Sequence, residues 1–180
     1  MFSVNETELP GVLEISGPSL RDPRGLFVKT LHIPAFERLG LNQLWAEHYW
    51  SSSSRNVLRG LHFQVPPHDH TKLVSCVAGV AWDVVVDLRR EAPTFGQHLV
   101  RELRPGGIMV YIPRGFAHGF LSLENHTILL YHVESAYVPA SDRGIRWDSC
   151  AIAWPDLGEP ATVSQRDAEF PTLNEFESPF

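Results

Sequence analysis

The feature that most restricts the fold of this chain is a series of short apolar runs separated by turn residues. Glycine and proline interrupt these runs at close intervals, as in Asp22-Pro23-Arg24-Gly25, Pro105-Gly106-Gly107 and Pro113-Arg114-Gly115. Such residues favour turns, and most runs are too short to form helices of ordinary length. The pattern predicts an all-β protein in which many short strands form a sandwich or barrel.

The apolar runs predict ten strands. They cover Gly11–Ile15, Leu26–Ile33, Leu44–Trp50, Val57–Gln64, Lys72–Val77, Val80–Leu88, Gln97–Leu103, Ile108–Ile112, Gly119–Leu123 and Thr127–Val133. Short helices are expected at Pro34–Leu39, which Gly40 ends, and around Ser164–Glu169. No repeat or linker is visible, so residues 1–180 are expected to form one domain. The irregular tail after Pro155 is expected to wrap the barrel or a partner subunit.

Composition indicates a soluble globular protein with one core. Of the 180 residues, 43% are hydrophobic and 20% are charged. The apolar run Cys76–Trp82 is too short to cross a membrane. The chain does not open on a basic segment followed by an apolar run, so no secretory signal is expected. Two cysteines fit reduced thiols in the cytoplasm. The net charge of −6 argues against nucleic-acid binding but permits a small anionic ligand held by local arginine and lysine.

The strand Val57–Gln64 carries residues suited to chemistry. Arg59 can hold an anion and His62 can move a proton, with Gly60 between them. Residues three positions apart point to opposite faces of a regular strand, so a bulge at Gly60 would be needed to bring both side chains together. A surface arginine and a hydrogen-bonded core histidine are an equally good interpretation of this segment alone.

A hairpin turn at Ala78-Gly79 would set the register of the two strands beside it. Lys72 would then lie opposite Val85 and diagonally between Asp83 and Asp87. A surface ion pair of this kind contributes little to stability. The alternate residues of the second strand are apolar, which favours instead an ammonium group held by carboxylates in the mouth of a barrel.

The segment Gly107–His118 has the spacing G-x5-P-x-G-x2-H, which matches the second motif of the cupin superfamily. This spacing describes a strand, a tight turn and a strand that points His118 into a barrel. Many cupins bind a metal ion through two histidines and a glutamate in a first motif and a histidine in the second. His68 and His70 could replace the first pair, but no glutamate follows at the required spacing. A metal-dependent cupin that uses these three histidines is therefore the minor alternative.

Several long motifs in the same order resemble the dTDP-4-dehydrorhamnose 3,5-epimerase family, from about Glu14 to Thr172. The matching segments are Asp22–Phe27, Val57–Gln64, Lys72–Val74, Asp83–Arg90, Pro93–Gly96, Ile112–Phe120, Tyr131, Tyr137–Pro139 and Gly144–Trp147. The resemblance implies a cupin jelly-roll barrel that uses no metal or other cofactor. It also implies a homodimer that exchanges strands and acts on a nucleotide-diphosphate 4-keto sugar.

The resemblance assigns the catalytic roles. The ketone at sugar C4 acidifies the hydrogens on C3 and C5, and the family removes such a proton and returns one to the opposite face. By resemblance, His62 is the base and Tyr131 the acid. Lys72 is expected to stabilise the enolate oxygen, because it is a compact cation. The family motif S-x-K-D corresponds to Ser164-Gln165-Arg166-Asp167, so Asp167 is expected to orient His62.

The resemblance also assigns binding residues. Arg24 and Arg59 would hold the diphosphate, because a guanidinium group suits paired oxygens. The others are His118 at the sugar or a phosphate, Tyr137 stacked on the nucleobase, Asp142 beside it, and Phe27 from the neighbouring subunit.

The chain departs from the family pattern near the substrate. Glu47-His48-Tyr49 stands where the family usually has Gln-Asp-Asn, and His132 follows the catalytic tyrosine where lysine is usual. Glu47 and Tyr49 are expected in the binding site, where Glu47 would repel a diphosphate unless it bonded a sugar hydroxyl or a cation. These changes leave the proton-transfer residues intact. Alternatives are therefore a GDP- or CDP-linked sugar, inversion of C3 alone, and a non-catalytic cupin that only binds sugar nucleotides.

Overall fold

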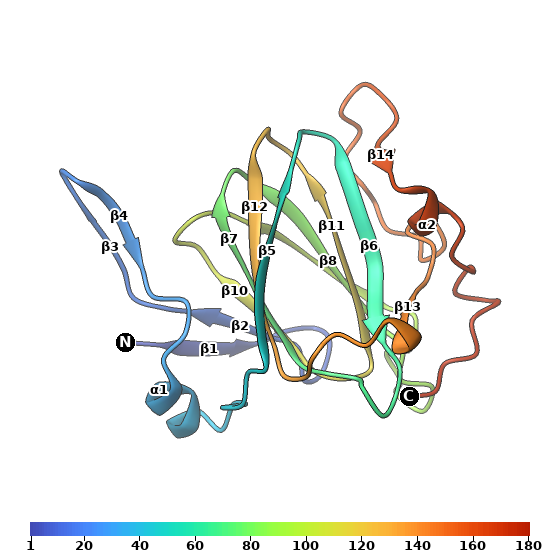
Figure 1. Ribbon diagram of the computed structural model, residues 1–180, viewed down its shortest axis with the longest axis horizontal. Helices are drawn as coiled ribbons and strands as arrows, with labels where there is room; N and C mark the ends of the chain where they lie inside the picture. Colours follow the sequence, from blue (N-terminus) through green and yellow to red (C-terminus); the bar gives the residue numbers. More distant parts are fainter.

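The computed structural model describes residues 1–180 as two mainly antiparallel sheets that face each other, with two short helices at the periphery (Figure 1). One sheet has the order β1 (Ser3–Glu6), β2 (Leu13–Ser16), β10 (Met109–Ile112), β7 (Lys72–Ala78), β12 (Thr127–Val133) and β5 (Glu47–Ser53). The other has the order β13 (Asp142–Gly144), β6 (Val57–Gln64), β11 (Phe116–Ser122), β8 (Ala81–Asp87) and β9 (His98–Leu103), and β14 (Thr162–Val163) pairs with β6. The predicted all-β cupin jelly roll is confirmed.

Two further strands, two helices and one 3-10 turn lie outside the two sheets. The strands β3 (Ser19–Asp22) and β4 (Gly25–Val28) form a separate hairpin that projects away from the barrel (Figure 1). The helices are α1 (Ile33–Arg38), which has Pro34 in its first turn, and α2 (Gln165–Ala168); a single 3-10 turn covers Pro139–Ser141. No helix is long and apolar enough to cross a membrane.

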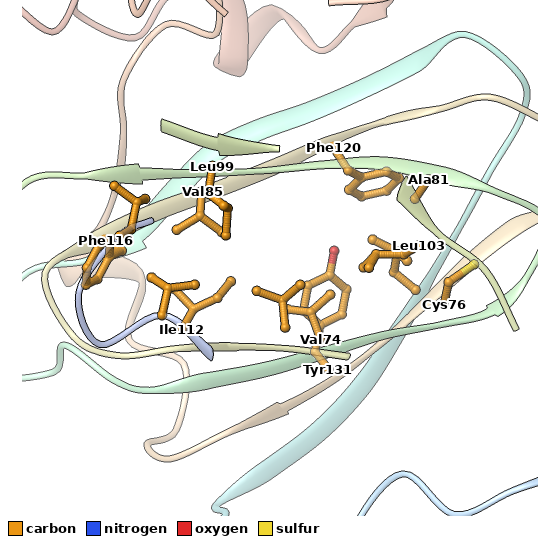
Figure 2. Close-up of a cluster of buried hydrophobic side chains, with 14 residues drawn as sticks. Val74, Cys76, Ala81, Val85, Leu99, Leu103, Ile112, Phe116, Phe120 and Tyr131 are labelled. Carbon is orange, nitrogen blue, oxygen red and sulfur yellow. The ribbon is translucent and has the colours of Figure 1, made fainter. Parts of the chain in front are cut away.

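The core fills the space between the sheets. Because side chains alternate along a strand, Leu129 and Tyr131 of β12 point inward. Figure 2 shows the Tyr131 ring among aliphatic side chains of both sheets, with its hydroxyl directed between them. On the outer side of the second sheet, Phe63 packs edge-on against Phe176 and Phe180. The C-terminal tail therefore wraps its own barrel, as one of the two expected alternatives.

The predicted hairpin at Ala78-Gly79 is wrong. The strand β7 pairs with β10 and β12, whereas β8 pairs with β9 and β11, so the two belong to different sheets. The chain turns a corner at Gly79, where the Thr127 hydroxyl accepts a hydrogen bond from the Val80 amide. Lys72 consequently lies opposite Ile112 and Val133 rather than opposite Val85.

Most predicted strands differ in their limits from the observed ones, and four short strands were not predicted. The strand expected at Gly119–Leu123 runs from Phe116 to Ser122. The strand expected at Leu26–Ile33 ends at Val28, since Ile33 already begins α1 with Pro34. The strand expected at Leu44–Trp50 runs instead from Glu47 to Ser53. The strands β1, β3, β13 and β14 escaped prediction because they are two to four residues long and show no clear apolar alternation.

Of the two interpretations of the Arg59–His62 segment, the structure shows the one with a bulge at Gly60. His62 lies opposite His118 and Arg59 lies opposite Phe120, so three steps along β6 match two steps along β11. Gly60 has φ of +116°, and a Cβ atom there would lie 2.6 Å from the Gly119 Cα atom. Only glycine allows this approach, and the extra residue turns Arg59 and His62 toward one cavity.

We predict that Gly60→Ala lowers the free energy of unfolding by about 3 kcal/mol or more, because it adds a backbone clash to an unfavourable φ. The matched control is Gly158→Ala, since Gly158 also has positive φ, +87°, but open space around its Cβ position. That variant should lose only about 1–2 kcal/mol. Urea denaturation of both proteins measures the difference, and equal losses would contradict the role given to close approach.

A histidine pair joins two strands on the outer face of the first sheet. His132 of β12 pairs in register with His48 of β5, and their Nδ1 atoms lie 2.5 Å apart. His132 is buried beside Trp45, and its Nε2 atom is buried without a hydrogen-bond partner. Burial, and then the nearby His48, lower the pKa of His132 to about 4. The folded protein therefore keeps this imidazole neutral.

We predict that the free energy of unfolding falls as the pH is lowered from about 6.5 toward 4. The unfolded chain takes up a proton near the ordinary histidine pKa of 6.5, whereas folded His132 does not, which amounts to about 2 kcal/mol at pH 5. Urea denaturation at pH 7 and pH 5 should show a smaller pH effect in His132→Leu than in the wild type. The control His98→Gln, in β9 at the sheet edge, should keep the wild-type slope. An unchanged slope in His132→Leu would contradict this account.

Candidate active site

Two adjoining cavities lie at the barrel. The inner cavity, here called the chamber, has a volume of about 180 Å³ and is lined by Tyr49, Ser51, Arg59, His62, Lys72, His118, Gly119, Phe120 and Tyr131. The outer cavity, about 450 Å³, is lined by Glu47, Tyr49, His62, Phe63, Gln64, His70, Lys72, Val133, Tyr137, Asp142 and Arg166. Because Tyr49, His62 and Lys72 line both, they mark the passage between the two.

His62 is oriented by a buried carboxylate. Its Nε2 atom lies 2.9 Å from Oδ1 of Asp167, and Oδ2 of Asp167 accepts the Gly60 amide at 2.9 Å. Burial favours the protonated acid, but the bonds from His62 and Gly60 outweigh it and lower the pKa of Asp167. A carboxylate can only accept, so His62 donates through Nε2–H and its Nδ1 atom carries the lone pair of the neutral ring. The expected contact between His62 and Asp167 is present.

Asp167 is placed by the local structure of the C-terminal tail. Ser164 caps α2, and its hydroxyl accepts the Asp167 amide at 3.1 Å. This cap fixes the first turn of the helix, which packs against β6. The expected motif Ser164–Asp167 therefore brings a carboxylate from the end of the chain to a strand more than 100 residues earlier.

Tyr131 lies in the chamber with its ring held by two neighbours. The Tyr49 ring stacks on it with centroids 4.9 Å apart and planes 16° apart. The His118 ring meets it edge-on at 5.8 Å, and Nε2 of His118 lies 2.7 Å from Oδ1 of the buried Asp83. Tyr131 is only 8% exposed. Burial, and then the nearby Tyr49 and Asp83, raise the pKa of Tyr131 well above 10, so the phenol keeps its proton at neutral pH.

Lys72 supplies a buried cation at the passage. Its Nζ atom donates to the His62 carbonyl oxygen at 3.0 Å, and the residue is only 8% exposed. Burial lowers the pKa of Lys72 to about 8, while Asp142 and Asp83 act in the opposite direction. Most of the population is therefore still charged at pH 7. A compact cation in this position can stabilise negative charge that develops in the chamber.

The outer cavity contains an exposed aromatic ring braced by carboxylates. The Tyr137 hydroxyl donates to Asp142 at 3.1 Å, and Arg166 pairs with the same carboxylate at 2.6 Å. The Tyr137 amide donates to Oε1 of Glu47 at 3.0 Å. Glu47 thus has a backbone donor as its partner, rather than the cation or sugar hydroxyl considered from the sequence. The Tyr137 ring remains 54% exposed and available for stacking.

The remaining expected binding residues fall into two groups. Arg59 lines the chamber, with its Nε atom donating to the Ser53 hydroxyl at 3.0 Å. Arg24 and Phe27 belong to the β3–β4 hairpin, which projects away from the barrel (Figure 1). Neither residue lines either cavity of its own chain. Within the hairpin, Arg24 pairs with Asp22 at 2.6 Å, and Phe27 is 58% exposed.

Two supporting residues have partners that the sequence did not predict. Asp83 was noticed as a carboxylate in an apolar strand, but its partner is His118 rather than a cross-strand lysine. Gln64 donates to the His68 carbonyl oxygen at 2.8 Å and accepts the Val138 amide at 2.7 Å, which fixes the loop before Tyr137. A glutamine next to the site had no spacing signal, because its partners come from distant loops.

The three histidines of the metal alternative are engaged elsewhere. His68 bonds the Ser141 hydroxyl, His70 bonds the Ser135 hydroxyl, and His118 bonds Asp83. No group of three or more His, Cys, Asp or Glu side chains is arranged to hold a metal ion. The residues proposed for a metal site therefore do not form a ligand set.

Comparison with known proteins gives matches along nearly the whole chain. A family model described as dTDP-4-dehydrorhamnose 3,5-epimerase matches residues 6–175. The dTDP-4-dehydrorhamnose 3,5-epimerase of Salmonella typhimurium is 37% identical over 179 residues, which cover 97% of each chain.

Two solved structures show the same fold. A dTDP-6-deoxy-D-glucose-3,5-epimerase from Legionella pneumophila, in complex with dTDP-4-keto-L-rhamnose, has a TM-score of 0.91 and 34% identity over 98% of this chain and 95% of that one. The 3′-monoepimerase ChmJ from Streptomyces bikiniensis, in complex with dTDP-quinovose, has a TM-score of 0.86 and 31% identity over 94% and 87%. From these matches in sequence and fold, the chain belongs to the dTDP-4-dehydrorhamnose 3,5-epimerase family of carbohydrate epimerases.

Proposed function

We propose that this epimerase inverts the carbons beside the C4 ketone of a dTDP-linked 4-keto-6-deoxy sugar, with His62 as the base and Tyr131 as the acid. One observation carries the proposal. An imidazole oriented by a carboxylate and a protonated phenol line the same chamber of about 180 Å³. The dTDP-sugar ligands of the Legionella and Streptomyces proteins support the choice of nucleotide.

The residues that line the chamber can account for each proton that the reaction moves. Nδ1 of His62 takes the proton from the carbon beside the ketone, and the electron pair moves onto the C4 oxygen as an enolate. The Lys72 ammonium stabilises that charge. When the enolate collapses, Tyr131 gives its phenolic proton to the opposite face of the same carbon, which inverts it. The phenolate then regains a proton from solvent, and His62 releases the one that it took.

The outer cavity suits the nucleotide diphosphate. The exposed Tyr137 ring offers a surface on which the base can stack. Asp142 accepts a hydrogen bond from the Tyr137 hydroxyl and Glu47 accepts one from the Tyr137 amide, and these contacts hold Tyr137 in place. Arg59, which lines the chamber, supplies positive charge for the diphosphate, and His118, which lines the same chamber, would contact the sugar.

We predict that the protein introduces deuterium from D₂O at C3, C5 or both carbons of a dTDP-4-keto-6-deoxy sugar. His62→Ala and Tyr131→Phe should each slow this exchange by about 10²–10⁴-fold, because each removes a positioned proton-transfer group. NMR of the sugar measures the exchange.

The control for this experiment is His98→Ala, because His98 lines neither cavity. It should exchange at the wild-type rate. A protein that binds dTDP-sugar without any exchange would favour the non-catalytic alternative. Exchange with only a GDP- or CDP-linked sugar would overturn the choice of nucleotide.

We further propose a homodimer in which each β3–β4 hairpin enters the partner's site. Leu20, Leu26 and Phe27 of this hairpin are exposed. A solitary two-stranded hairpin is only marginally stable in water, and exposed apolar side chains grouped together mark an interaction site. Packing these three side chains against a second copy of the chain would remove them from water and stabilise the hairpin. Arg24 and Phe27 would then reach a cavity that they do not reach in their own chain.

We predict complementation between two impaired variants. Arg24→Ala should bind substrate weakly, and His62→Ala should be inactive. After the two are mixed, denatured and refolded together, half of the sites in a heterodimer receive an intact His62 and an intact Arg24 from different chains. Activity of the mixture should exceed the sum of the separate variants. Arg21→Ala, from the same hairpin, is the control and should have little effect. Additive activities would argue against an exchanged hairpin.

We also propose that the protein works in the reducing cytoplasm. Cys76 and Cys150 are both free and buried, and neither contributes to a disulfide. Free buried thiols are typical of proteins that stay in a reducing compartment.

A further inference from the structure

We infer that Tyr49 is a positioning residue that fixes the direction from which Tyr131 returns its proton. It thereby makes this epimerase favour one of the two carbons that flank the ketone. This inference rests on the proposed function, and it concerns a residue at which the chain departs from its family.

The rings of the two tyrosines stack across adjacent strands, with Tyr49 on the edge strand β5 and 43% exposed. Tyr49 of β5 is the direct register partner of Tyr131 of β12. Their side chains lie on the same face, and their nearly parallel rings stack with centroids 4.9 Å apart. The strand β12 lies between β5 and β7 in the sheet, so hydrogen bonds on both sides hold its backbone.

Tyr131 has little room to change its orientation. Tyr49 covers a face of the ring, and His118 meets it edge-on at 5.8 Å. His118 is itself buried and held by Asp83 at 2.7 Å, so it cannot yield easily. A densely packed side chain keeps one rotamer, and its hydroxyl therefore keeps one position in the chamber.

A fixed acid treats the two carbons differently. C3 and C5 lie on either side of C4, two bonds apart, whereas a misplacement of about 1 Å can already slow a positioned proton transfer by about 10²-fold. A phenol that could tilt would be able to follow both carbons. A Tyr131 phenol that the stack holds in one orientation protonates the nearer of the two carbons faster.

The family pattern supplies the contrast. Asparagine is the usual family residue at this position, and its amide has no aromatic face to stack on Tyr131. Tyr49 also lines both cavities, so a change here can alter substrate binding as well. A ratio of rates at two carbons of one bound sugar separates these effects, because weaker binding lowers both rates equally.

The test measures initial rates of deuterium incorporation at C3 and C5 of dTDP-4-keto-6-deoxyglucose by NMR. We expect the wild type to label one carbon about 10-fold faster than the other. Tyr49→Phe keeps the stack and should keep this ratio. Tyr49→Asn should bring the two rates within about 3-fold of each other by accelerating the slower carbon relative to the faster. Tyr49→Leu fills similar space without stacking, and it gives a second reading should the asparagine variant fold poorly.

The outcomes are distinguishable. Absence of label at both carbons in the wild type would overturn the proposed function and this inference together. Equal labelling in the wild type, or a ratio that is the same in the wild type, Tyr49→Asn and Tyr49→Leu, would overturn the inference and leave the proposed function standing. A ratio lost in Tyr49→Phe as well would assign the effect to the hydroxyl and would also overturn the role of the stack.

Discussion

The close approach of β6 and β11 at Gly60 is the constraint on which the site depends. A side chain at this position would meet the backbone of Gly119, so the extra residue that shifts the register can be accommodated only by glycine. The shift turns Arg59 and His62 to one side, and the Gly60 amide is free to bond Asp167. One backbone irregularity therefore links the barrel, the histidine and the carboxylate that orients it.

The surroundings of the two proton-transfer groups set opposite protonation states. Asp167 is held ionised by its hydrogen bonds and keeps His62 in the tautomer that presents Nδ1 as an acceptor. Tyr131, in an apolar and crowded part of the same barrel, is held in its protonated form. A base and an acid with opposed preferences facing one chamber suit a reaction that removes a proton and returns another.

Four departures from the family pattern lie on one pair of adjoining strands. Glu47, His48 and Tyr49 lie on β5, and His132 lies on the adjoining β12. On the outer face of the sheet, His48 and His132 stand where the family usually has aspartate and lysine, and their imidazole rings are in contact. Inside the barrel, a stacked ring replaces an amide. The strand β6 keeps the family motif around His62, and α2 keeps Asp167 but has Arg166 where the family motif has lysine.

The all-β class could be predicted from local alternation and turn chemistry, and the Ser164–Asp167 segment could be matched to a contiguous family motif. A bulge at Gly60 was one of two interpretations that the sequence left open. The sequence did not determine which sheet each strand joins, so Lys72 was assigned the wrong neighbours. The stack of Tyr49 on Tyr131, the bond between His118 and Asp83, and the distance of the β3–β4 hairpin from its own cavities were also decided only by the tertiary structure. These contacts join residues far apart in the chain, and hydrophobic alternation sets the face of a side chain but not the strand that lies beside it.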